Sequence, residues 1–587
     1  MTAFDARVHD YLEHLYGPRA GEIQRRLNQH LDHFFAATQR QPTARQTAEL
    51  APSWCEKDQW LITYGDSIID EQTPPLAVLD DFLQTRLGDL ISGVHVLPFF
   101  PWSSDDGFSV IHYREVNPDL GDWPHIQALA RHYDLMADLV LNHVSRESLW
   151  FVDYLSGSLP GRDYFIDVDP DTDVSGVVRP RSSPLLVPIS TRRGTRYLWA
   201  TFSEDQLDLN FENPDVLLEF VGILLFYLQQ GTRIVRLDAV AFLWKRLGTA
   251  CIHLPETHTV VRLLRAIVDQ AAPGTLLVTE TNVPHHENIS YFGLDRCADG
   301  PPDEAHMIYQ FTLPPLLLHT LTRGETDTLQ AWLASLPPLP DHCTYLNFTA
   351  SHDGIGVRPL EGLLPDHERD ALLELMHRFG GFVSMRSNPD GSDTPYEINI
   401  TWFEAMQGTR KGPDPWQIAR FLCSQAIMLS LQGIPALYIH TLTGTLNDVE
   451  GVERSGRLRS INRRRWQRRE LDLLLDSTAT PTHDVFNALS RLLARRRHEA
   501  CFHPNAAQRV VPSPTSLLAI ERGPLADGRR LLALYNVTEL PLAFDQLGAD
   551  VQQALSSAPW HDLDEQAPEP PTASLPPYAV RWLVSHG

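Results

Sequence analysis

Several features that define common protein classes are missing from this sequence. No window approaches the roughly 18 consecutive apolar residues that a membrane span requires, and the first residues contain no apolar signal core. The six cysteines are scattered without a CxxC pair, so neither a zinc knuckle nor a disulfide framework is indicated. We therefore expect a cytoplasmic chain with reduced, mostly buried thiols that engages no membrane.

The sequence also contains fewer basic residues than acidic ones. The 587 residues include 49 Lys and Arg against 74 Asp and Glu, which gives a formal net charge of -25. Such an excess of negative charge repels polyanions and argues against nucleic acid as a partner. Two arginine runs, RRRW at 463–466 and ARRRH at 494–498, are local exceptions that we interpret as solvated helix faces.

What the sequence does contain is a regular alternation of short apolar runs and amphipathic stretches. With 43% hydrophobic and 21% charged residues, the chain can bury a large core. The apolar runs lie at 60–66, 93–100, 135–143, 233–240, 276–282, 307–311, 345–353 and 435–439. Because strands that alternate with helices form parallel sheets, this pattern predicts an α/β fold with a (β/α)8 TIM barrel.

Three further segments complete the predicted organisation around a barrel at 55–144 and 211–505. Residues 1–54 show helical spacing without strands and are predicted to form a helical N-terminal extension. The gap at 145–210 after the third strand is too long for one crossover helix and predicts an inserted domain. Residues 506–587 change to short strands with turns, which predicts a C-terminal antiparallel β domain.

One apolar run contains two opposite charges. The stretch RIVRLDAVAFLW places Arg236 and Asp238 two residues apart in a predicted strand, so their side chains share a face. Active sites of TIM barrels lie at the C-terminal ends of the strands, and the pair belongs there. From this strand alone, a buried structural ion pair is an equally good interpretation.

Two other strands carry acids at the same end. Glu280 ends the run LLVTETN, and TASHDGIGV delivers His352 and Asp353, so three acids converge on one rim. Paired carboxylates there suit glycosidic bond cleavage, in which one attacks the anomeric carbon and the other moves a proton. We expect Asp238 to be a nucleophile whose pKa Arg236 keeps low, and Glu280 to be the general acid with a raised pKa.

Asp353 is then expected to hold sugar hydroxyls, and two histidines to donate hydrogen bonds to the same ring. These are His352 and His143, which ends DLVLNH. Strict alternation would put Asp138 and His143 on opposite faces, so the strand must end before His143. A purely structural role for His143 remains an equal alternative.

Four motifs in this order and spacing resemble the sequence regions of the α-amylase superfamily of glycoside-active barrels. They are DLVLNH at 138–143, RLDAV at 236–240, TETN at 279–282 and SHD at 351–353. The resemblance covers the barrel and implies Asp238 as nucleophile, Glu280 as acid/base and Asp353 as transition-state stabiliser. Asn142 contributes to a calcium site in amylases, but the acidic partners of such a site are not evident in the insert, so no metal is expected.

Further strings resemble the narrower sucrose-phosphorylase-like branch, and the long form of the chain is most similar to its glucosylglycerate phosphorylases. These strings include ITYGDS at 62–67, GVHVLPFFP at 93–101, the RPR of VRPRSSP, and RSINRR at 459–464. The similarity implies that Asp66 and Arg459 hold the far side of a donor glucose, bordered by Phe202 and Gln206. It also implies that Arg181 and Tyr396 face the acceptor side, where phosphate enters.

A cation at the acceptor side has a physical reason. Phosphate can replace water in a site with three carboxylates only if a fixed cation offsets the repulsion, and the guanidinium fork of Arg181 matches phosphate geometry. A glycerate carboxylate would need a cation too, for which Arg179, Arg181 and Arg192 are candidates. Glu397 follows Tyr396, where sucrose enzymes commonly carry a neutral amide.

The resemblance implies a retaining α-glucoside phosphorylase that converts a small α-glucoside and phosphate into α-glucose 1-phosphate and free acceptor. 2-O-α-Glucosylglycerate is the favoured substrate, with sucrose or glucosylglycerol as alternatives and an α-glucosidase or transglucosylase as a more distant one. A noncatalytic sugar-binding relative is disfavoured by the intact acids. We expect no cofactor apart from phosphate as co-substrate, and a monomer or homodimer.

Overall fold

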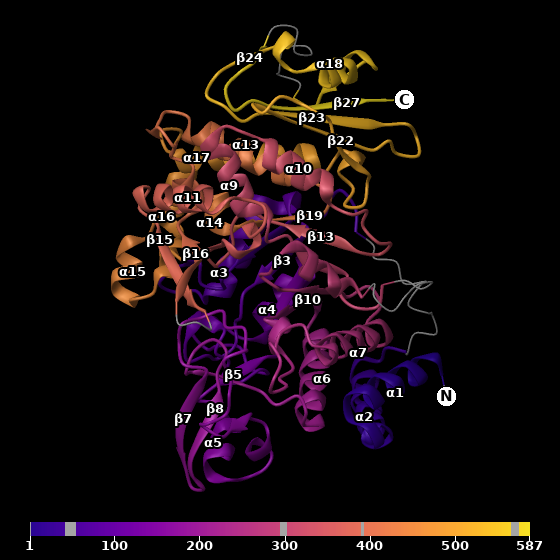
Figure 1. The fold of residues 1–587 in the computed structure, drawn as a ribbon. Helices are drawn as coiled ribbons and strands as arrows, with labels where there is room; N and C mark the ends of the chain where they lie inside the picture. Colours follow the sequence, from indigo (N-terminus) through magenta and orange to yellow (C-terminus); the bar gives the residue numbers. More distant parts are fainter. Residues whose placement is uncertain (1, 42–53, 294–301, 389–391, 565–573, 587) are drawn as a thin grey trace.

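The computed structural model describes residues 2–41, 54–293, 302–388, 392–564 and 574–586 (Figure 1). Its centre is a closed barrel of parallel strands. The strands are β1 (Trp60–Thr63), β3 (Gly93–Val96), β4 (Asp134–Val140), β10 (Thr232–Asp238), β11 (Leu276–Thr279), β12 (Met307–Tyr309), β13 (Thr344–Asn347) and β19 (Ile434–Tyr438). Each predicted strand is present, so the predicted (β/α)8 barrel is confirmed.

The register of the barrel brings polar residues of neighbouring strands together. Arg236 on β10 lies opposite Asp138 on β4 and opposite Val278 on β11, and Asp238 lies opposite Val140. Because β10 ends at Asp238, the two carboxylates flank Arg236 at the C-terminal end of the barrel. Apolar side chains of both strands are buried below this level.

The N-terminal helices α1 (Ala3–Tyr16) and α2 (Ala20–Thr38) lie beside α6 (Pro214–Gln229) and α7 (Pro255–Ala271) of the barrel (Figure 1). Tyr16 anchors this contact by donating to the Phe211 carbonyl at 2.9 Å. The helical N-terminal region is thus confirmed, while positions 42–53 of the predicted extension fall outside the described residues.

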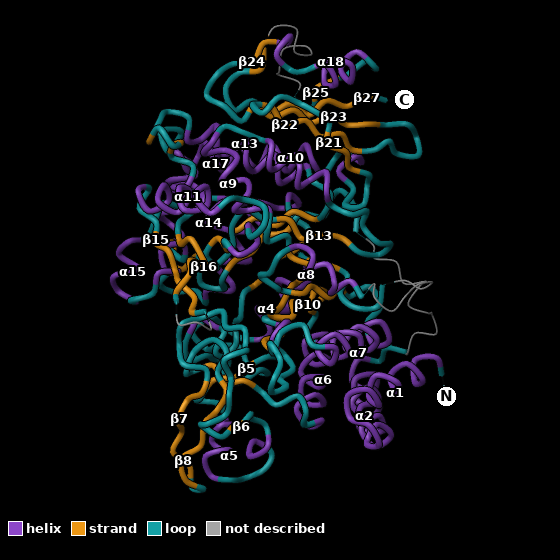
Figure 2. Tube along the Cα trace, viewed as in Figure 1, coloured by secondary structure: helices purple, strands orange, loops and turns teal. Residues whose placement is uncertain are grey.

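The long segment after β4 contains a helix, α5 (Leu149–Ser156), and a hairpin of β7 (Leu186–Thr191) and β8 (Gly194–Trp199) (Figure 2). It returns through β9 (Gln206–Asp208), which pairs antiparallel with β5 (His143–Ser145). That pairing fixes the segment to the C-terminal end of β4.

The C-terminal region forms a five-stranded antiparallel sheet, which lies over the helices of one side of the barrel (Figure 1). Its order is β21 (Gln508–Val510), β22 (Leu517–Arg522), β23 (Arg530–Asn536), β27 (Val580–Ser585) and β25 (His561–Asp562). Arg496 and Arg522 are fully buried where this region meets the barrel, and both donate to backbone carbonyl oxygens. The expectation that the second arginine run is a solvated face is therefore wrong for Arg496.

The structure also bears on the cysteines and on the search for membrane-spanning helices. Among the described cysteines none forms a disulfide; Cys251, Cys343, Cys423 and Cys501 are buried, Cys55 is half-buried, and Cys297 lies outside the described residues. Within the described ranges, no helix has the length and apolar content to cross a bilayer.

Candidate active site

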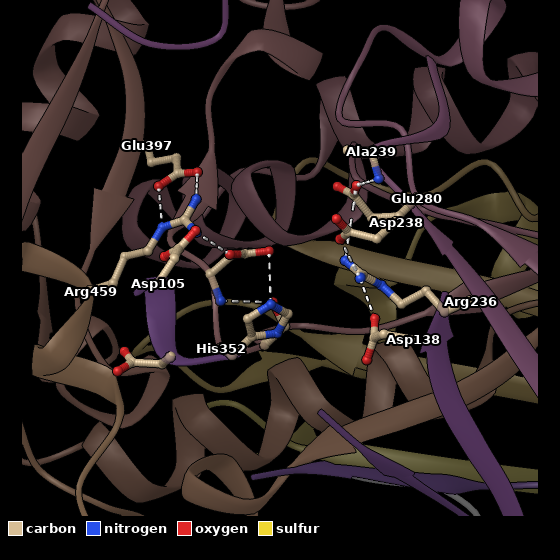
Figure 3. Close-up of polar contacts among 12 residues, drawn as sticks. Asp105, Asp138, Arg236, Asp238, Ala239, Glu280, His352, Glu397 and Arg459 are labelled. Carbon is tan, nitrogen blue, oxygen red and sulfur yellow. Dashed lines mark hydrogen bonds and ion pairs between the residues drawn. The ribbon is translucent and has the colours of Figure 1, made fainter. Parts of the chain in front are cut away.

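A cavity of about 60 Å³ lies at the C-terminal ends of the barrel strands, which we call the donor cavity (Figure 3). It is lined by Asp105, Phe108, His143, Arg181, Phe202, Gln206, Arg236, Asp238, Ala239, Glu280, Asn282, His352, Asp353, Tyr396, Glu397 and Arg459. The structure thus brings the predicted site residues together, with the exception of Asp66.

Arg236 organises the acids of the donor cavity. Its side chain is only 2% exposed, and its Nη1 donates to Asp138 at 2.5 Å and to Asp238 at 2.6 Å. Its Nη2 lies 3.9 Å from the Glu280 carboxylate. Its guanidinium also stands 5.5 Å from the ring centre of Tyr309, an energetically favourable cation–π contact. The Arg236–Asp238 ion pair is therefore buried within the structure, and both of its residues also line the donor cavity.

A strained residue links the two predicted catalytic acids. Ala239 has φ 50° and ψ 26°, a left-handed conformation that few residues with a side chain adopt. In this conformation its amide donates to Glu280 Oε2 at 3.0 Å. The main chain directly after Asp238 therefore holds the carboxyl group of Glu280, the residue that follows the neighbouring strand β11.

Burial raises the pKa of Asp238 to about 7, so the expectation of a low value is wrong. The positive charge of Arg236 is shared with Asp138, whose own negative charge adds to the rise. Burial likewise raises the pKa of Glu280 to about 7, as predicted. Since Arg236 donates directly to Asp238 and is farther from Glu280, we expect the negative charge on Asp238 and the proton on Glu280.

Asp353 and His352 form the opposite wall. Burial opposes ionisation of Asp353, but Arg459 and Arg463 lower its pKa, and Arg459 Nη1 lies 2.6 Å away. Burial holds the pKa of His352 far below its usual value, which keeps the ring neutral. This ring stacks on Phe108 with centroids 4.8 Å apart and planes at 5°. The wall thus combines one fixed anion with one neutral donor.

His143 lies beyond the end of β4 at Val140 and begins β5, as the alternation predicted. Burial lowers its pKa, and its Nε2 donates to the Phe108 carbonyl at 2.8 Å. Gln206 Nε2 is 3.2 Å from the same ring nitrogen. This nitrogen is therefore engaged within the protein, which favours the structural alternative, although the ring still borders the cavity.

Lys245 lies between two polar residues of the paired strands β5 and β9. These are Asn142, which precedes β5, and Asp208, the last residue of β9. Lys245, with its side chain 5% exposed, places Nζ 2.6 Å from Asn142 Oδ1 and 2.6 Å from Asp208 Oδ2. Asn142 is the residue that the amylase resemblance connects with calcium, and here it accepts from an ammonium group. In the described part of the chain, no group of three or more His, Cys, Asp or Glu could hold a metal ion.

The structure corrects the assignment of Asp66. Its carboxylate lies 2.7 Å from Arg465 and borders a different cavity, because the chain turns away after β1 ends at Thr63. Asp105 instead lines the donor cavity with Arg459, and its Oδ2 accepts from Gln206 at 3.3 Å. The acidic pair in SSDDG at 103–107, within the loop that follows β3, is the sequence signal that could have identified Asp105.

The predicted acceptor side contains two cations around one carboxylate. Glu397 accepts from Arg459 through Nη2 at 2.5 Å and Nε at 3.1 Å, and Arg181 Nη1 lies 3.6 Å from it. The Arg181 guanidinium also stands 5.2 Å from the ring centre of Tyr396. Glu397 and Tyr396 belong to β16 (Asp393–Asn399), which pairs with β15 (Phe382–Ser387).

The other two arginine candidates do not reach the donor cavity. Arg179 is half-buried and does not line it, and Arg192 is exposed beside the turn between β7 and β8. Asn282 is a lining residue that the sequence prediction missed. Its position two residues after Glu280 in TETN was the available signal.

Comparisons with known proteins agree with this geometry. Residues 83–352 match the family model described as Alpha amylase, catalytic domain. The chain is 44% identical to the glucosylglycerate phosphorylase of Escherichia coli (strain K12), over 91% of this chain and 93% of that protein. It is 43% identical to the glucosylglycerate phosphorylase of Allomeiothermus silvanus, over 98% of each. The crystal structure of sucrose 6F-phosphate phosphorylase from Thermoanaerobacter thermosaccharolyticum superposes with a TM-score of 0.70 and 26% identity, covering 82% of this chain and 94% of that one.

Proposed function

We infer the function from the family to which this chain belongs, the glucosylglycerate phosphorylase-like glycoside phosphorylases of the α-amylase superfamily. We propose that it catalyses reversible phosphorolysis of 2-O-α-glucosylglycerate to α-glucose 1-phosphate and glycerate. The observation that carries the proposal is the Asp238–Arg236–Glu280 arrangement, two carboxyl groups within 4 Å of one buried guanidinium. No cofactor enters the proposed reaction.

In the first step, Asp238 attacks the anomeric carbon while the bond from that carbon to the glycerate oxygen breaks. Glu280 gives its proton to the departing oxygen, so glycerate leaves with a hydroxyl group and a glucosyl ester remains on Asp238. Arg236 supports this division of roles because it donates to the nucleophile at 2.6 Å. The raised pKa of Glu280, about 7, allows that residue to hold a proton at neutral pH.

In the second step, a phosphate oxygen attacks the same carbon and the ester bond to Asp238 breaks. Glu280, now a carboxylate, takes the proton of the attacking phosphate, and α-glucose 1-phosphate leaves. Two inversions restore the original anomeric configuration. Asp353, held ionised by Arg459 at 2.6 Å, is suited to bind sugar hydroxyls through both steps.

Arg181 is the cation that we assign to the anionic acceptor. Among the three arginine candidates it alone lines the donor cavity, and it stands over Tyr396. Its closest carboxylate is Glu397 at 3.6 Å, which also takes two donors from Arg459. Arg181 is therefore not committed to a close ion pair and can contact phosphate or the glycerate carboxylate in turn.

The test is synthesis in the reverse direction. The chain is incubated with α-glucose 1-phosphate and, separately, glycerate, glycerol, fructose or fructose 6-phosphate, and released inorganic phosphate is measured. We expect glycerate to release phosphate fastest, and a faster rate with glycerol or fructose would support a glucosylglycerol or sucrose phosphorylase instead. Release that is equally fast without any acceptor would support a hydrolase. The Asp238→Asn variant is the control for non-enzymatic release.

A further inference from the structure

A second cavity, of about 1130 Å³, borders the donor cavity region but shares no lining residue with it. We call it the second cavity. Its walls come from the loop after β1, the loop after β3, and residues 447–465. Ligand sites in proteins commonly measure about 300 to 1,000 Å³, so this space is sufficient for a small molecule. Asp66, which the sequence analysis assigned to the donor glucose, lines this second cavity instead.

A short turn separates the two cavities. Asp105, Asp106 and Gly107 have consecutive positive φ values of 53°, 48° and 115°. Asp105 lines the donor cavity, whereas its neighbour Asp106 lines the second cavity. Backbone strain of this kind persists where the surroundings enforce it, and here Arg463 pairs with the Asp106 carboxylate.

Arg463 connects the turn at 105–107 to the donor cavity. Its Nε donates to the carbonyl of His352 at 2.9 Å, while its Nη1 contacts Asp106. The side chain is only 6% exposed, so the expectation of a solvated arginine run is also wrong at this position. A molecule bound to the free edge of this guanidinium would contact the residue that holds the His352 backbone.

Two buried polar atoms on this wall lack partners among the described residues. They are Arg463 Nη2 and the hydroxyl of Tyr64, whose residue is 9% exposed. Both residues line the second cavity, and the Arg463 guanidinium stands 5.5 Å from the Tyr64 ring centre. Both atoms are closed to solvent, and leaving such a group unsatisfied costs about 1 to 3 kcal/mol, so each side chain gains by turning toward a ligand in the cavity that offers a hydrogen bond.

The charges of the lining indicate which kind of ligand fits. Six carboxylates line the second cavity against four guanidinium groups, an excess that disfavours phosphate or another anion. Asp66 accepts and Arg463 donates on the same wall, and the half-buried indole of Trp102 offers a flat apolar surface. Hydroxyl groups both donate and accept, and sugars pair them with an apolar face.

We propose that the second cavity is a binding site for a neutral polyhydroxylated molecule of hexose size. Tyr64 and Arg463 contribute the donors, and Asp66 contributes an acceptor. The inference does not depend on the proposed function, because none of the donor-cavity residues takes part in it.

Equilibrium dialysis of the full chain with radiolabelled glucose tests the proposal. Because the donor cavity is proposed to hold a glucosyl unit as well, we expect two classes of glucose site. The dissociation constant of one class should rise about three- to tenfold in Tyr64→Phe, since that change removes one hydrogen bond. Asp66→Asn is a second, independent variant and should weaken the same class. Tyr227→Phe is the matched control, because its hydroxyl is also buried without a partner but lies outside both cavities.

Asn282→Ala alters only the donor cavity and should leave this class unchanged. The proposal is overturned if no glucose binding is weakened by either Tyr64→Phe or Asp66→Asn, or if Tyr227→Phe weakens it equally. It is also overturned if inorganic phosphate or glycerate displaces the bound glucose from this class. A chain that binds glucose in this way but releases no phosphate in the synthesis assay would contradict only the proposed function.

Discussion

Replacing Lys245 by methionine should destabilise the protein strongly, because this lysine supplies the positive charge for a fully buried carboxylate. Asp208 is 0% exposed and lies 2.6 Å from the Lys245 ammonium. Its remaining donors are neutral: the amide and hydroxyl of Thr201 at 2.9 and 2.6 Å and the Asn142 amide at 3.2 Å. Removing one partner of a buried ion pair typically costs about 3 to 5 kcal/mol, and we expect Lys245→Met to fall in that range.

The assay is urea denaturation followed by tryptophan fluorescence, with free energies of unfolding compared between variants. Lys411→Met is the matched control, because Lys411 also pairs with a carboxylate, Glu539, but its side chain is 78% exposed. That change should cost less than about 1 kcal/mol. The double variant Lys245→Met/Asp208→Asn should recover stability, since no unpaired charge remains. The reasoning is refuted if Lys245→Met costs no more than the control, or if the double variant is as unstable as the single one.

Four further predictions concern the chemistry. Asp238→Ala should abolish glucosyl transfer from every donor, and appreciable turnover, measured as released phosphate or glycerate, would contradict its role as nucleophile. Glu280→Gln should block transfer to and from glycerate yet retain activity with α-glucosyl fluoride, whose fluoride leaves without a proton; equal loss with both donors would remove Glu280 as the acid. Because burial raises the pKa of Glu280 to about 7 and the first step needs its protonated form, kcat/KM for phosphorolysis should fall tenfold per pH unit above about 7. A profile that stays flat to pH 9 would contradict this assignment. Arg181→Ala should raise the KM for phosphate by about 10- to 100-fold, the value of a charge-assisted hydrogen bond, while hydrolysis of the glucoside changes less. An unchanged phosphate dependence would remove Arg181 from the site.

The barrel and its acids could be predicted from the sequence because both depend on local order along the chain. Apolar runs define the strands, and a residue at the end of a run, such as Asp238 or Glu280, must lie on the rim once the strands are parallel. The same logic placed the end of β4 before His143. These inferences need no knowledge of how the loops fold.

The errors arose where the outcome depends on loops or on several charges together. Asp66 and Asp105 both follow strands, and only the path of each loop decides which one borders the donor cavity. The pKa of Asp238 depends on Asp138, which shares Arg236 with it from a neighbouring strand. Arg463 and Arg496 are buried because acceptors from distant segments surround them, and a local charge run gives no sign of that.

The hydrogen bond from the Ala239 amide to Glu280 means that main-chain geometry sets the spacing of the two acids. Arg181 lies outside this link, so its replacement should leave the Ala239–Glu280 hydrogen bond in place. An extra residue inserted between Asp238 and Ala239 would move the amide that anchors Glu280 out of reach. The position of Glu280 thus depends on the backbone conformation of Ala239, a residue whose own side chain is a single methyl group.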